Sequence, residues 1–134
     1  TKMNLTEFSK EVHENAVNHG WWEQERSFGE IIALCHSELS EALEEYRNNK
    51  PLMYYHCDSH DTRLMCPDKY DGCQYGENKG CMQRKPEGIA VELADCIIRI
   101  LDCCGKENID IESVIKIKHE YNKTRPYKHG GKVI

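Results

Sequence analysis

Apolar residues recur at helical spacing in four separate segments of the chain, and this period restricts the possible folds more than any other feature. An apolar stripe that repeats about every 3.6 residues is typical of an amphipathic helix. No stretch alternates between apolar and polar residues for long enough to predict a strand. We therefore expect an all-α fold, a four-to-five-helix bundle, with helices at residues 4–19, 27–48, 86–105 and 110–123.

Residues at the predicted helix ends support these boundaries. Gly20 stops the first helix, and Ser27-Phe28-Gly29-Glu30 has the pattern of a capping box at the start of the second. Pro86-Glu87 would place proline in the first turn of the third helix and an acid near its positive end. Asp110 is the predicted N-cap of the fourth helix, which has to end before Pro126.

The length and composition fit one small domain, covering residues 1–134. Hydrophobic residues make up 39% of the chain and charged residues 31%, as expected for helices with solvated outer faces. A subunit of this size with long amphipathic helices often completes its core by pairing with a second copy.

The net charge of -5 predicts no general attraction for polymeric nucleic acid or for an anionic membrane. No apolar run approaches the roughly 20 residues that are needed to cross a bilayer. Residues 1–10 lack the apolar segment of a secretory signal, so we expect a cytoplasmic protein. In that compartment the eight cysteines are expected to be thiols or metal ligands rather than a disulfide framework.

The most informative residues are two pairs of acids, which we call the acidic quartet. Glu38 and Glu41 lie in the second predicted helix, and Glu92 and Asp95 lie in the third. Residues three apart share one face of a helix. Each pair also borders the apolar stripe of its own helix. The stripe of the second helix consists of Ile31, Leu34, Glu38, Ala42 and Glu45, and that of the third consists of Ile89, Leu93, Cys96, Ile97 and Ile100.

Carboxylates beside a core cost free energy unless a cation or hydrogen bonds compensate them. Four converging carboxylates would also raise one another's pKa values unless a divalent ion is bound. Ligands that offer only oxygen select a hard cation such as Mg²⁺, which Mn²⁺ can replace. Glutamates at this spacing are common on solvated helix faces, so one pair alone would carry little information. Two pairs that border two stripes indicate a metal site.

Lys118, Asn122 and Arg125, which we call the C-terminal triad, lie at the end of the fourth predicted helix. Arginine offers a bidentate fork and lysine a point charge, and both are common ligands of phosphate oxygens. The alternative is a disordered basic tail. Trp21 and Trp22 follow the first helix directly. Tryptophan there either caps the core or stacks on a base, so Trp22 is a candidate substrate-binding residue.

Residues 50–86 show no helical period, and a connection of about 37 residues without structure is unusual in a compact domain. Cys57, Cys66, Cys73 and Cys81 lie in this insert. Their spacing lacks the C-x2-C pairs of a typical zinc site, so Zn²⁺ ligands, disulfides and free thiols all stay open. The other four cysteines lie on or near apolar helical faces, and we expect them to be buried as small hydrophobic side chains.

Together these motifs resemble those of the MazG-like all-α NTP pyrophosphohydrolases. The resemblance rests on residues 36–45, on residues 88–97 and on the K-x-x-x-N-x-x-R pattern from Lys118 to Arg125. Their order and spacing match the family's pattern. The resemblance covers most of the chain apart from the insert, because the minimal form of the family has a much shorter connection there.

The resemblance implies Mg²⁺-dependent hydrolysis of a nucleoside triphosphate to a monophosphate and pyrophosphate. It implies that the acidic quartet binds the Mg²⁺ ions and that the C-terminal triad contacts the triphosphate. Either Glu38 or Glu41 would position or deprotonate the attacking water. Relatives are dimers or dimer-derived tetramers, so the resemblance also implies self-association.

Two other functions stay open. No base-reading motif is visible, so the substrate could equally be dUTP, dCTP or phosphoribosyl-ATP. The chain could instead be a non-catalytic, zinc-stabilised helical binding module, an alternative that the cysteine-rich insert and the basic tail support.

Overall fold

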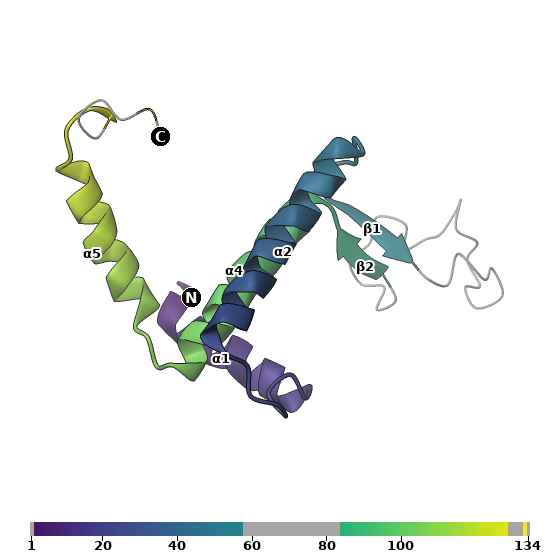
Figure 1. Cartoon of the computed structure of the whole chain (residues 1–134), viewed down its shortest axis with the longest axis horizontal. Coiled ribbons are helices and arrows are strands. Elements are labelled where there is room, and N and C mark those ends of the chain that lie inside the picture. Colours follow the sequence, from purple (N-terminus) through teal and green to yellow (C-terminus); the bar gives the residue numbers. More distant parts are fainter. Residues whose placement is uncertain (1, 58–83, 129–132, 134) are drawn as a thin grey trace. The chain divides into compact units, whose positions relative to one another are not determined.

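A computed structural model of the chain describes residues 2–57, 84–128 and 133. This part of the chain confirms the mostly helical fold. Four helices and one two-stranded sheet are labelled in Figure 1: α1 Leu5–Asn18, α2 Phe28–Arg47, β1 Tyr54–Cys57, β2 Arg84–Glu87, α4 Ile89–Lys106 and α5 Ile111–Lys123. Within the described residues, every helix is too short or too polar to cross a membrane.

The chain forms two compact units. The first consists of residues 1–31 and 98–134, and the second consists of residues 32–97. The second unit therefore contains the whole acidic quartet, whereas the C-terminal triad belongs to the first.

In the first unit, hydrogen bonds cap the starts of α1 and α5 and join them to each other. The side chain of Asn4 caps α1 by accepting from the backbone N–H groups of Thr6 and Glu7, at 2.9 and 3.1 Å. Asp110 caps α5, as predicted, by accepting from the backbone N–H of Ser113 at 3.3 Å. The Thr6 hydroxyl donates to Asp110 at 2.7 Å and so joins the two helix starts. These hydrogen bonds lower the pKa of Asp110.

Small residues bring α1 and α4 together in the first unit. Ser9 is only 1% exposed. A Cβ atom added to Gly105 would overlap the backbone carbonyl of Ser9 and lie 2.6 Å from Cβ of His13. Glycine is therefore required at position 105 by the close approach of α1. The four cysteines predicted to pack as hydrophobic side chains are all buried, namely Cys35, Cys96, Cys103 and Cys104.

The start of α2 confirms the predicted capping box. The Ser27 backbone N–H donates to the Glu30 carboxylate at 2.7 Å, and the Glu30 backbone N–H donates to the Ser27 hydroxyl at 3.2 Å. The predicted stripe of α2 is also confirmed, because Ile31, Glu38 and Ala42 are buried.

The third predicted helix begins at Ile89, three residues later than expected. Pro86 and Glu87 belong instead to β2, where they pair with Tyr55 and Tyr54 of the antiparallel strand β1. The prediction that residues 50–86 contain no strand was therefore wrong at both ends of the insert. Each strand has only four residues, too few to show alternation, and the pairing rather than the local sequence stabilises them.

The predicted apolar stripe of α4 is only partly buried. Cys96 is 7% exposed, but Leu93, Ile97 and Ile100 are 44%, 54% and 43% exposed. The stripe is therefore present on α4, but one chain leaves these three residues exposed. Periodicity identifies the apolar face of a helix, but it does not identify what covers that face. Further along α4 the buried side chains are Leu101, Cys103 and Cys104.

Candidate metal centre

Three carboxylates of the acidic quartet converge within the second unit. One oxygen atom each from Glu38 and Glu41 of α2 and from Glu92 of α4 lies within 4.8 Å of the other two. Residues 38 and 41 share a face of α2 because they are three apart, and α4 presents Glu92 to that face. In the described part of the chain this is the one group of three or more side chains placed to share a metal ion.

The three carboxylates differ in their access to solvent. Glu38 is 7% exposed and lies in the buried stripe of α2. Glu92 is half-buried and Glu41 is exposed. The cluster therefore extends from the core to the surface, so a ligand can approach from the side of Glu41 while Glu38 stays shielded from water.

The cluster perturbs the protonation of Glu92. Its pKa rises from 4.5 to about 7. Burial of the carboxyl group is the largest cause, followed by a hydrogen bond with Glu41 and by the negative charges of Glu41, Asp95 and Glu38. Without a cation, the Glu92 carboxyl group therefore keeps its proton up to near neutral pH. A divalent ion would replace that proton.

Asp95, the fourth member of the quartet, lies one helical turn from Glu92 on α4 and is half-buried. It lies outside the group of three but close enough for its charge to raise the pKa of Glu92. The structure thus brings three of the predicted ligands into one cluster and places the fourth beside it.

The donor set fits a hard divalent cation. It consists of carboxylate oxygens alone, and it includes one buried carboxylate and one that holds its proton up to about pH 7. Mg²⁺ and Mn²⁺ prefer such oxygen ligands and retain waters that phosphate oxygens can replace. Softer ions favour the nitrogen and sulfur ligands that this cluster lacks.

Sequence reasoning missed a hydrogen bond at the edge of the centre. The Tyr54 hydroxyl on β1 donates to both carboxylate oxygens of Glu45, each at 3.0 Å. Glu45 was predicted to lie on the apolar stripe of α2. Nothing in the sequence indicated that it would accept a hydrogen bond from Tyr54, because residues 50–86 were expected to be irregular.

Trp22 lies in a polar network of the first unit. Its indole N–H donates to the two Asp102 oxygens at 3.0 and 3.2 Å, and His13 Nδ1 donates to Asp102 at 2.8 Å. The Lys106 ammonium lies 5.0 Å from the centroid of the Trp22 ring. Hydrogen bonding and a cation–π contact thus hold Trp22 in place. Trp21 is the more exposed indole, at 55%.

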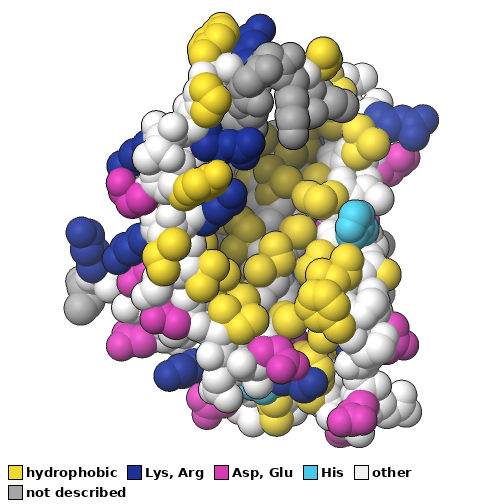
Figure 2. Space-filling view, turned by 60° about the vertical axis from the view of Figure 1, so that its left-hand side comes forward, with side chains coloured by type: hydrophobic (Ala, Val, Ile, Leu, Met, Phe, Trp, Pro, Cys, Tyr) yellow, Lys and Arg dark blue, Asp and Glu magenta, His cyan; other side chains and the backbone are white. Residues whose placement is uncertain are grey.

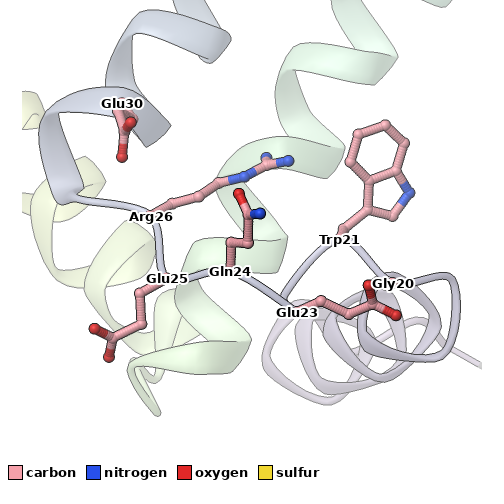
Figure 3. A pocket seen from close by; sticks show the side chains of 7 residues that line it. All are labelled: Gly20, Trp21, Glu23, Gln24, Glu25, Arg26 and Glu30. Carbon is pink, nitrogen blue, oxygen red and sulfur yellow. The ribbon is translucent and has the colours of Figure 1, made fainter.

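A shallow polar pocket of about 280 Å³ lies beside Trp21 in the first unit. In Figure 3 the Arg26 side chain extends toward Trp21, and Glu25 points away from it. The Arg26 guanidinium lies 5.4 Å from the centroid of the Trp21 ring. The lining residues come from one loop and the first turn of α2: Gly20, Trp21, Glu23, Gln24, Glu25, Arg26 and Glu30.

Lys118 and Asn122 of the C-terminal triad lie in the second half of α5, and Arg125 lies just beyond its end. Lys118 and Asn122 are exposed, and Arg125 is half-buried. The Lys118 ammonium lies 4.8 Å from the centroid of the Tyr121 ring, and the backbone N–H of Arg125 donates to the carbonyl of Asn122 at 3.2 Å. The triad therefore presents two cationic side chains at one end of a helix.

The structure bears little on the predicted zinc ligands. The backbone of Cys57 forms the last residue of β1. Cys66, Cys73 and Cys81 lie outside the described residues.

Comparison of the chain with family models, with curated proteins and with solved structures finds no match.

Proposed function

We propose that the chain is a Mg²⁺-dependent nucleoside triphosphate pyrophosphohydrolase of the MazG-like type, releasing a monophosphate and pyrophosphate. The observation that carries the proposal is the convergence of Glu38, Glu41 and Glu92 within 4.8 Å, with Glu38 buried. Three carboxylates this close together repel one another, and a bound cation would relieve that repulsion. The motifs shared with that family then favour a triphosphate as the substrate.

Each residue of the centre has a distinct role in the proposed reaction. Glu38 and Glu92 would hold the cation, with Asp95 adding negative charge beside them. Glu41 is the exposed carboxylate, so it can reach a water on the solvent side and accept its proton during in-line attack on the triphosphate. Bound Mg²⁺ would neutralise phosphate charge and lower the pKa of that water.

The C-terminal triad would hold the triphosphate. Lys118 and Arg125 supply positive charge, and Asn122 supplies an amide donor, all at the end of α5. These groups recognise phosphates rather than a base, so the proposal covers triphosphates as a class, with dUTP, dCTP and phosphoribosyl-ATP among the candidates.

We also propose that the chain associates with a second copy of itself. In the second unit Leu39 and Leu43 of α2 are 47% and 57% exposed, and Leu93 and Ile97 of α4 are 44% and 54% exposed. Each pair is four residues apart and so makes an apolar stripe. Figure 2 shows many hydrophobic side chains at the surface. A helix from another copy, with the same kind of stripe, is a partner of matching chemistry.

The direct test is a panel of ribo- and deoxynucleoside triphosphates together with phosphoribosyl-ATP, incubated with Mg²⁺ or Mn²⁺. We expect pyrophosphate, not orthophosphate, as the product. Glu41→Gln should lower kcat by about 10²-fold or more, because a positioned general base contributes at least that much. Circular dichroism should show unchanged helix content, since Glu41 is exposed.

Glu44→Gln is the matched control. Glu44 lies three residues further along α2, is 62% exposed and contacts Arg47 at 3.7 Å, so its loss should leave kcat unchanged. Absence of turnover with the whole panel would exclude the hydrolase and favour the zinc-stabilised binding module. Equal activity of Glu41→Gln and Glu44→Gln would remove Glu41 from catalysis.

A further inference from the structure

The Tyr54 hydroxyl is a fixed hydrogen-bond donor at the end of α2. It donates to both oxygens of Glu45 at 3.0 Å. Burial of the phenol, the hydrogen bond to Glu45 and the negative charges of Glu45 and Glu87 raise the pKa of Tyr54 to about 12. The phenol therefore keeps its proton at any physiological pH and stays able to donate to Glu45.

Glu45 lies on the same face of α2 as the metal centre. It is one turn beyond Glu41 and two turns beyond Glu38, at helical spacing along the stripe. A free carboxylate at this position would repel Glu41, since residues four apart on a helix are neighbours. Because the Tyr54 hydroxyl donates to both oxygens of Glu45, that carboxylate is turned toward β1.

The segment that carries Tyr54 also holds the start of α4. The carbonyl of Leu52 accepts from the backbone N–H of Ala90, in the first turn of α4, at 3.0 Å. Gly88 has φ of +113°, and a Cβ atom there would lie 2.6 Å from the Leu52 carbonyl oxygen. Tyr54 itself pairs with Glu87 across the sheet.

These contacts connect the two helices that carry the ligands. Residues 52–54 bind the end of α2 through one side chain and the start of α4 through the backbone. Glu92 follows Gly88 by about one turn, and its backbone N–H donates to the carbonyl of Gly88 at 3.0 Å. The position of Glu92 along the axis of α4, relative to Glu41 on α2, therefore depends on residues 52–54.

We propose that Tyr54 is a positioning residue of the metal centre: its bond to Glu45 fixes the axial register of α2 against α4, so that Glu92 meets Glu38 and Glu41. This inference rests on the proposed function, which supplies the metal. The α4 side of the connection consists of backbone bonds and of an interaction between Tyr54 and the Glu87 side chain, and the Tyr54 hydroxyl joins this segment to Glu45 of α2.

The test is Tyr54→Phe, which removes one oxygen atom and keeps the ring. Mn²⁺ binding to the protein alone, measured by electron paramagnetic resonance, should weaken about tenfold, as for other groups that orient metal ligands. With Mn²⁺ at saturation, kcat should recover most of its value while KM for the triphosphate stays the same. Tyr46→Phe is the control, because Tyr46 is next to Glu45 on α2 and is 68% exposed.

Glu45 provides a second, independent variant. Glu45→Leu removes the acceptor and should weaken Mn²⁺ binding as Tyr54→Phe does, and the double variant should be no weaker than either single one. Glu45→Gln keeps an acceptor oxygen and should bind Mn²⁺ within about threefold of the unmodified protein. This rescue distinguishes positioning from a general loss of stability.

Two outcomes would overturn the inference: Mn²⁺ binding in Tyr54→Phe that equals binding in Tyr46→Phe, or additive losses in the double variant. A different measurement, triphosphate turnover, tests the proposed function. If the unmodified protein binds Mn²⁺ but turns over no triphosphate, the hydrolase is excluded, whereas the Mn²⁺ measurements still decide the role of Tyr54.

Discussion

Metal binding at the acidic centre should release a proton near neutral pH. The pKa of Glu92 is about 7 in the metal-free protein because the carboxyl group is partly buried and lies against Glu41. With that pKa, Glu92 is about 90% protonated at pH 6 and about 10% protonated at pH 8. A carboxylate ligand has to be deprotonated to bind a metal. Apparent Mn²⁺ affinity should therefore rise about tenfold between pH 6 and pH 8.

Isothermal titration calorimetry can count the proton directly. Mn²⁺ is titrated in two buffers of different ionisation enthalpy, and the difference gives the protons released per ion. We expect about 0.9 proton at pH 6 and about 0.1 at pH 8. Glu92→Gln should abolish this dependence. Glu107→Gln should preserve it, because Glu107 is exposed at 55% and lies just beyond the end of α4. Equal affinity and no proton release at both pH values would refute the raised pKa of Glu92 as a factor in metal binding.

The same proton determines how stability depends on pH. The folded pKa of Glu92, about 7, is above its ordinary value of 4.5. Its stabilising contribution is thus fully present below about pH 4.5 and is lost as pH rises through about 7. A cation that binds only the folded state reverses that loss. The increase in Tm caused by Mn²⁺ should therefore be larger at pH 8 than at pH 6.

Two further predictions concern packing and association. Gly105→Ala should destabilise the fold by about 2 kcal/mol in chemical denaturation, because the new methyl group meets the backbone of Ser9. Gly29→Ala is its control, since the nearest atom is a side-chain oxygen at 3.8 Å, and helix propensity should make that variant up to about 1 kcal/mol more stable. Light scattering should show a dimer or a larger multiple, and Leu43→Lys should raise its dissociation constant at least about tenfold. A monomer at about 100 μM would contradict the proposed self-association.

The sequence predicts the helices and the ligand-bearing faces well, for a physical reason. Helix ends are determined by local chemistry, and the predicted caps at Ser27 and Asp110 are both present. The stripe on α2 placed Glu38 beside the core, and Glu38 is buried. Spacing along one helix is a local property, so the pairing of Glu38 with Glu41 needed no knowledge of the rest of the fold.

Other features depend on contacts between distant residues, which a single sequence does not reveal. Pro86 looked like the first turn of a helix, but pairing with Tyr55 places it in a strand. Leu93 and Ile97 lie on the predicted apolar stripe of α4, but the stripe alone does not show what covers them, and one chain leaves them exposed. The bond from Tyr54 to Glu45 likewise arises only once β1 folds back on α2.

The strand pair also explains how a long insert can separate two helices that share a metal centre. Cys57, the last residue of β1, pairs with Arg84, the first residue of β2. The two ends of the sequence between them are therefore close together. The contacts that set the height of α4 against α2, through Leu52 and Tyr54, all lie on the helix side of that pair. The described contacts that place Glu92 near Glu41 are therefore made by residues that lie outside the span 58–83.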